Sequence, residues 1–150
     1  MAVAAAFAPS ASFAASGKQG AADSNGVHRN LLQVTTKTGT HKLTIEWAVS
    51  PSERERGLMG REKMAADHGM LFDFGSEQPL QFWMKDTPLS LDMIFIKADG
   101  RTSRIERATT PFSERLIPSG APVRYVLELV AGSADRLGLA TGDRFTIPKR

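Results

Sequence analysis

Charged and aromatic side chains that could bind a ligand concentrate between residues 53 and 92. Arginine pairs with carboxylate or phosphate groups through two parallel hydrogen bonds, and tryptophan stacks on flat groups. The combination predicts a groove for a small anionic or sugar-like ligand. The predicted ligand-binding residues are Arg56, Arg61, Trp83, Lys85, Asp86 and Asp92.

A predicted strand over residues 80–85 determines which way the side chains of Trp83 and Lys85 point. Successive side chains of a strand point to opposite faces, so Trp83 and Lys85 share one face while Phe82 and Met84 share the other. One face can then be core and the other a site. Asp92 lies inside an apolar run, where a carboxylate needs a partner, and Lys85 or an arginine of the preceding helix is the expected one.

Three other interpretations fit the same residues. The aromatic and methionine side chains can be core, with Glu53 and an arginine holding a short helix on the sheet, so that the domain is structural or binds another protein. Paired carboxylates, Asp86 and Asp92 with Glu106 as a third candidate, could serve hydrolysis by acid–base catalysis. Methionine thioethers suit Cu(I), and the residues in question are Met59, Met70, Met84 and Met93.

Several kinds of chemistry are excluded or unsupported. There is no cysteine, so disulfides, thiolate metal sites and thiol nucleophiles are absent. His28, His41 and His68 have no partner at metal-ligand spacing. No phosphate-binding, dinucleotide-binding, zinc-protease or nucleophile-elbow motif is present, and no cofactor is predicted.

The elements that must position the candidate site are short strands. Alternating or continuous apolar runs bounded by turn residues predict strands, and the absence of long helices argues against βαβ units. We predict a mainly β fold, a single small β-sandwich or barrel-like domain with about eight short strands and two short helices. Predicted strands cover 31–36, 41–49, 70–74, 80–85, 91–96, 103–108, 125–130 and 144–147.

The first helix has a clear start signal. Ser50 is a capping residue, Pro51 suits the first helical position, and Glu53 can reach back to the cap. Gly57 and Gly60 then limit the helix to a few residues. Ser133 is expected to cap a second short helix that Gly138 ends.

Residues 1–30 are expected to be a leader rich in Ala, Ser and Gly, with a single β-rich domain over 31–150. The apolar run up to Pro9, followed by small residues near Ala15, resembles a secretory signal without its charged start, and predicts an exported, periplasmic protein over a cytoplasmic one. No stretch is long and apolar enough for an integral membrane segment.

The charge balance bears on partners. Nineteen basic and sixteen acidic residues give a net charge of +3, and the basic residues are interspersed with acidic ones. This predicts no nucleic-acid partner. A small polar ligand remains the expected partner, and we expect a monomer.

Several sequence blocks together resemble the uncharacterised family called domain of unknown function 192. They are Glu53–Arg61, Gly69–Phe72, Phe82–Thr87, Leu91–Ile96, Val126–Leu129 and Gly142–Asp143, within a span from Leu31 to Ile147. The resemblance implies a β-rich single domain, often exported and without an established activity. Asp86 stands where the family usually has Asn, and a carboxylate lacks the amide's two donors.

Overall fold

The computed structural model describes residues 2–3 and 30–150. The predicted leader, including its signal-like segment, therefore lies outside the described residues except for strand β1 (Ala2–Val3) and residue 30. The predicted mainly β fold is confirmed. None of the helices in the described ranges is long and apolar enough to cross a membrane.

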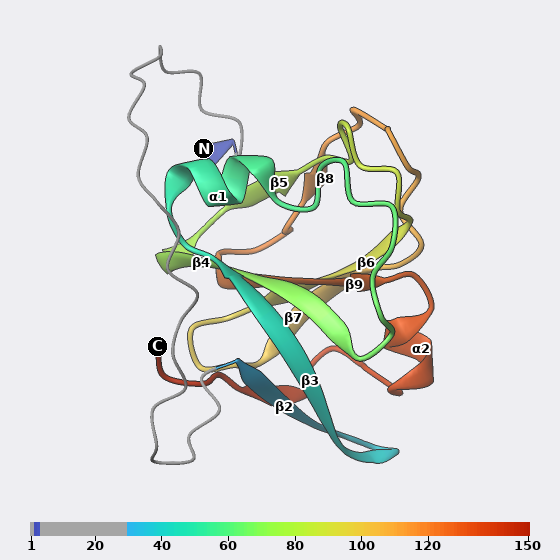
Figure 1. Cartoon of the computed structure of the whole chain (residues 1–150). Helices are drawn as coiled ribbons and strands as arrows, with labels where there is room; N and C mark the ends of the chain where they lie inside the picture. The colour runs from blue at the N-terminus through green and yellow to red at the C-terminus, as the bar shows by residue number, and fades with distance from the viewer. Residues whose placement is uncertain (1, 4–29) are drawn as a thin grey trace.

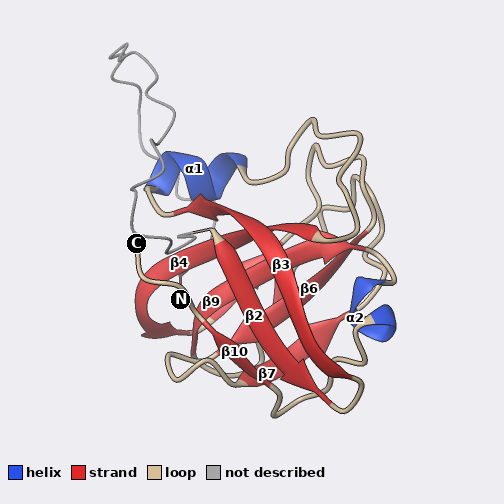
Figure 2. Ribbon diagram, turned by 60° about the horizontal axis from the view of Figure 1, so that its bottom comes forward, coloured by secondary structure: helices blue, strands red, loops and turns tan. Residues whose placement is uncertain are grey.

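The main sheet has seven strands in the order β10-β2-β3-β4-β9-β6-β7 and curls strongly (Figure 2). Its edge strands meet at one end, where Arg101 bridges to Arg144 and the Thr102 amide donates to the Asp143 carbonyl over 2.8 Å. The result is a partly closed, barrel-like sheet. Its strands are β2 (Leu31–Thr36), β3 (Gly39–Ala48), β4 (His68–Gln78), β6 (Leu91–Ile96), β7 (Thr102–Glu106), β9 (Val123–Val130) and β10 (Arg144–Thr146).

A second, three-stranded sheet has the order β1-β5-β8. Strand β5 (Leu80–Phe82) pairs in parallel with β1 and antiparallel with β8 (Ile117–Pro118). Helix α1 (Pro51–Arg56) lies on the same side of the main sheet as β5, and α2 (Ser133–Arg136) lies at the other end of the molecule (Figure 1).

The main sheet separates two apolar clusters because its central strands are buried on both faces. In β9, Leu127 and Leu129 belong to one cluster and Val126 to the other. In β6, Ile94 and Phe95 divide in the same way. The second cluster also contains Phe82 and Met84 from the region of β5. The face that carries the candidate site is thus largely covered by protein.

One connection differs from the expectation that crossover units are absent. Strands β3 and β4 are parallel neighbours, with Thr44 opposite His68 and Ala48 opposite Phe72. A parallel pair requires a crossover. Here the six-residue helix α1 and the irregular chain over 57–67 supply it, so no long helix is needed.

Asp92 has a structural position on the face of β6 that belongs to the first cluster. It is 1% exposed, and its two oxygens accept hydrogen bonds from the amides of Ala108 (2.9 Å) and Ala134 (2.8 Å). The expectation that Lys85 or an arginine of the helix is its partner is wrong. Backbone amides of the chain after β7 and of α2 satisfy this carboxylate instead.

Replacing Asp92 should therefore destabilise the fold. Asp92→Ala leaves two amides without their acceptor, and we expect a loss of about 2–4 kcal/mol in the free energy of unfolding. Urea unfolding followed by circular dichroism measures it. Asp135→Ala is the matched control, because it removes only an ion pair of the 75%-exposed Asp135 with Arg107 and should cost about 0.5 kcal/mol or less. Equal stability of Asp92→Ala and the wild type would contradict this role.

Candidate functional site

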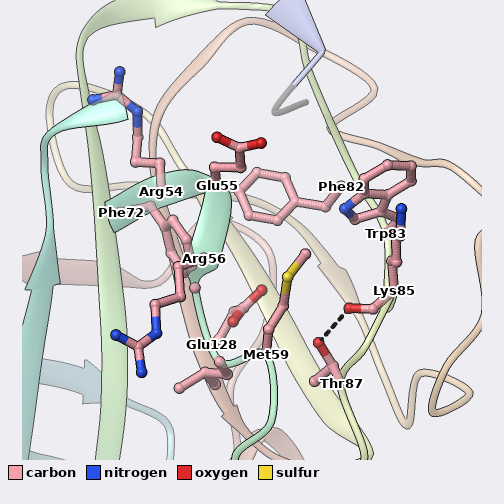
Figure 3. Close-up of a pocket in the computed structure, with 12 residues that line it drawn as sticks. Arg54, Glu55, Arg56, Met59, Phe72, Phe82, Trp83, Lys85, Thr87 and Glu128 are labelled. Atoms are coloured by element: carbon pink, nitrogen blue, oxygen red, sulfur yellow. Dashed lines mark hydrogen bonds between the residues drawn. The ribbon is translucent and has the colours of Figure 1, made fainter. Parts of the chain in front are cut away.

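A small cavity of about 30 Å³ lies between α1, the chain after β5 and the centre of the main sheet. Figure 3 shows side chains from these three places facing one another. Helix α1 and its following loop form one wall, and the segment after β5 forms the opposite wall. The lining residues are Arg54, Glu55, Arg56, Gly57, Leu58, Met59, Phe72, Phe82, Trp83, Lys85, Thr87 and Glu128.

The first wall is held in place by local sequence. The predicted capping box is confirmed: the Glu53 amide donates to Ser50 Oγ, and Glu53 Oε2 accepts from the Ser50 amide at 2.8 Å. Gly57 ends the helix at φ 44°, and a Cβ atom there would lie 3.1 Å from the Phe72 ring. A residue without a side chain therefore lets the end of α1 approach the sheet.

The two walls are tied together by backbone. The amide of Gly60 donates to the carbonyl oxygen of Asp86 over 2.8 Å. Asp86 itself has φ 52°, in the left-handed region that Asn and Asp adopt more readily than other side chains. This backbone requirement gives a physical reason why both Asn and Asp suit the position. The Asp86 side chain is exposed and lines neither of the cavities described here.

The second wall is the Trp83 segment, residues 83–87. Strand β5 ends at Phe82, so the prediction of a strand reaching Lys85 is wrong; its partner β8 has only two residues. The expected alternation nevertheless continues. Met84 is 1% exposed, whereas Trp83 and Lys85 are half-buried and line the cavity. Lys85 Nζ lies 5.3 Å from the Trp83 ring centroid, a cation–π contact.

A turn fixes this segment. The amide of Met84 donates to the Ser113 carbonyl at 2.8 Å, and that of Thr87 donates to the Met84 carbonyl at 3.1 Å. The hydroxyl of the buried Thr87 donates to the Lys85 carbonyl at 3.0 Å (Figure 3). The positions of Trp83 and Lys85 are thus set by backbone contacts that do not involve their own side chains.

Glu128 forms the floor of the small cavity and was not among the predicted site residues. It lies in the central strand β9, between Met70 of β4 and Met93 of β6, and is 5% exposed. Within residues 30–150, no hydrogen bond or ion pair reaches its carboxyl group. Burial disfavours the charged form and raises the pKa of Glu128 to about 8. It is therefore largely protonated at neutral pH.

A signal for Glu128 exists in the sequence. It is the one charged residue between Tyr125 and Val130, just as Asp92 is within its own apolar run. The alternation of side chains does not say which face of the sheet opens on a cavity. The structure places Glu128 on that face and Asp92 on the other.

A larger cavity of about 400 Å³ adjoins the same loop and shares Arg56, Gly57 and Met59 with the small one. Arg61 lines it and forms a two-pronged ion pair with Glu46, whose second bond is 2.9 Å long. His68 Nε2 lies 2.8 Å from Glu46 Oε1. Arg61 is thus engaged by Glu46, and among the predicted residues Arg56, Trp83 and Lys85 are those brought to the small cavity.

The structure does not bring together the residues expected for hydrolysis, and it places methionines expected for Cu(I) binding in the core. Asp86 and Asp92 do not meet at either cavity, because the first is exposed and the second is bound by backbone amides. Met84 and Met93 are core residues, and Met84 Sδ accepts from the Thr109 hydroxyl at 3.2 Å. Met59 and Met70 line the larger cavity. Copper binding stays an untested prediction.

Comparisons with known proteins agree with the sequence resemblance. The family model DUF192, described as Uncharacterized ACR, matches residues 33–147. A crystal structure from Sinorhizobium meliloti 1021, described as a candidate transcription regulator, is 53% identical with a TM-score of 0.75, covering 77% of this chain and 91% of that one. A protein of unknown function from Novosphingobium aromaticivorans DSM 12444 is 34% identical with a TM-score of 0.75, covering 77% and 83%. No curated protein matches.

The ion pair at the larger cavity should make stability depend on pH. The hydrogen bond from Arg61 is the main cause that lowers the pKa of Glu46 to about 2, from 4.5. Because the pKa is lower in the folded state, the stabilisation is complete above pH 4.5 and is lost as the pH falls towards 2. Thermal unfolding of the wild type and Glu46→Gln should therefore converge over this range.

The exposed Glu62 provides the control for that experiment. Glu62→Gln should follow the wild-type pH profile throughout. A stability difference between the wild type and Glu46→Gln that stays constant from pH 5 to 2 would show that the pair does not act in this way.

Proposed function

The chain belongs to the domain of unknown function 192 family, and from that premise we propose that it is a binding domain for a small polar or anionic ligand. The observation that carries the proposal is that Arg56, Trp83 and Lys85 all line one small cavity. These residues come from two separate segments, α1 and the Trp83 segment, which form opposite walls of the cavity (Figure 3).

Charge supports an anionic ligand. No described residue forms an ion pair with the side chain of Arg56 or Lys85, whereas many other basic side chains are engaged: Arg61 by Glu46, Arg104 by Glu106, Arg107 by Asp135 and Arg124 by Asp73. Glu55 also lines the cavity but is exposed, and its carboxylate points away from Glu128 (Figure 3). Positive charge in a concave site attracts anions.

The aromatic side chain supports a flat or partly apolar ligand group. Trp83 is half-buried at the cavity, and Phe82 and Met59 provide further apolar lining. Ligand sites combine such apolar surface with a few placed polar groups. Thr87 and Glu128 add polar groups to the charged side chains of the lining.

The transcription-regulator description of the Sinorhizobium meliloti relative is not the function that the site favours. Nucleic-acid binding calls for a basic stripe that faces phosphates. The ion pairs described above neutralise much of the basic surface, and the net charge of +3 is modest. A small anion fits the cavity better than a nucleic acid fits this surface.

Binding is tested by ligand-induced stabilisation with sodium acetate and inorganic phosphate as probes. A probe at ten times its dissociation constant should stabilise the wild type by about 1.4 kcal/mol, a rise of several degrees in Tm. We expect Arg56→Ala and Lys85→Ala to unfold close to the wild-type temperature without a probe, because neither side chain forms an ion pair with a described residue. Both variants should lose most of the probe-induced rise.

Two variants separate binding from nonspecific effects. Lys97→Ala removes an exposed lysine that does not line either cavity and should keep the full rise. In Trp47→Phe, Trp83 is the remaining tryptophan of the two, so its fluorescence should change on titration. Stabilisation that Arg56→Ala and Lys85→Ala retain, or no stabilisation by either probe, would overturn the proposal.

A further inference from the structure

The carboxyl group of Glu128 is a polar group to which no described residue donates a hydrogen bond. The side chain is 5% exposed, and its carboxyl oxygens face the small cavity (Figure 3). Asp73 and Asp92, the other buried carboxylates of the described chain, are satisfied: Arg124 and the Gly75 amide bind Asp73, and two amides bind Asp92. A buried polar group without a partner costs free energy unless a ligand or water supplies one.

The charged groups that line the cavity together with Glu128 come from two of the elements that enclose it. Arg54, Glu55 and Arg56 come from α1, and Lys85 from the Trp83 segment. The Arg54 guanidinium is already engaged by the carbonyl oxygens of Val49 and Asp73. The neighbouring positions on β4 and β6 are the uncharged Met70 and Met93. The cations of the lining for which no described residue supplies an ion pair or a hydrogen-bond acceptor are therefore Arg56 and Lys85, one on each wall of the cavity (Figure 3).

The size of the cavity limits the group that can reach Glu128. A buried water needs roughly 10–15 Å³ of comparable space, so about 30 Å³ holds two or three water-sized atoms. A planar carboxylate head has three heavy atoms, whereas a tetrahedral phosphate has five. The rest of a larger acid would have to lie outwards, beside Trp83.

We propose that the neutral carboxyl group of Glu128 donates a hydrogen bond to the carboxylate of a small organic acid, with Arg56 and Lys85 balancing its charge. This inference rests on the proposed function and names its ligand class. A neutral carboxyl group has one O–H donor, and a hydrogen bond to a charged acceptor is stronger than one between neutral groups. Ionised Glu128 would instead repel the ligand.

Binding should then depend on pH with a defined sign. Glu128 binds the ligand only in its protonated form, so affinity is constant well below pH 8 and falls about tenfold for each pH unit above it. Glutamine keeps a donor at every pH, so Glu128→Gln should bind without this dependence. Glu55→Gln is the matched control, since it alters an exposed glutamate at the same cavity.

The experiment is a titration with acetate, which stays ionised from pH 6.5 to 9.5, followed by amide chemical shifts. We expect affinity to fall above pH 8 in the wild type and Glu55→Gln, and to stay level in Glu128→Gln. Calorimetry in two buffers provides a measurement without a variant: above pH 8, each acetate bound by the wild type should be accompanied by uptake of close to one proton.

The experiment distinguishes failure of this inference from failure of the proposed function. Acetate affinity that does not change with pH, or that falls equally in Glu128→Gln, or binding without proton uptake overturns the role of Glu128. Phosphate binding that requires Arg56 and Lys85 while acetate does not bind overturns the organic-acid class and leaves the proposed function standing. Absence of binding by both probes overturns both.

Discussion

The burial of one carboxyl group in the middle of the sheet is the constraint around which the candidate site is arranged. Glu128 lies in β9 with β4 and β6 on either side, and it is 5% exposed. Its place is on the face covered by α1 and the Trp83 segment. Burial raises the pKa of Glu128 there, and no described residue forms an ion pair with Arg56 or Lys85, which line the same cavity.

The remaining architecture explains how such a group is tolerated. The opposite face of the sheet carries an apolar cluster that does not depend on the site, and Asp92 ties β6 to α2 on that side. On the site face, the capping box, Gly57 and the bond between Gly60 and Asp86 hold the walls by backbone contacts. Trp83 and Lys85 are therefore positioned largely by contacts of the main chain, whereas Phe72 and Phe82, which also line the cavity, belong to the apolar core.

Local patterns predicted the elements well. The strands over 31–36 and 91–96 were predicted to the residue, because alternating or continuous apolar side chains are bounded by turn residues. The predictions that were wrong concern features set by contacts between residues distant in the chain. Strand β5 ends early because its partner β8 is short. Asp92 and Glu128 are each the one carboxylate of an apolar strand, so the sequence does not distinguish the structural carboxylate from the one at the cavity. Which face opens on a cavity depends on α1 and the Trp83 segment, distant in the chain.

The protonation state of Glu128 tests the account most directly. The pKa of this side chain can be measured by a carbon-detected NMR titration of glutamate carboxyl carbons, with its signal identified by its loss in Glu128→Gln. We predict a midpoint of about 8 in the ligand-free protein. A midpoint close to the ordinary value of 4.5 would mean that the group is ionised at neutral pH, and would contradict the account.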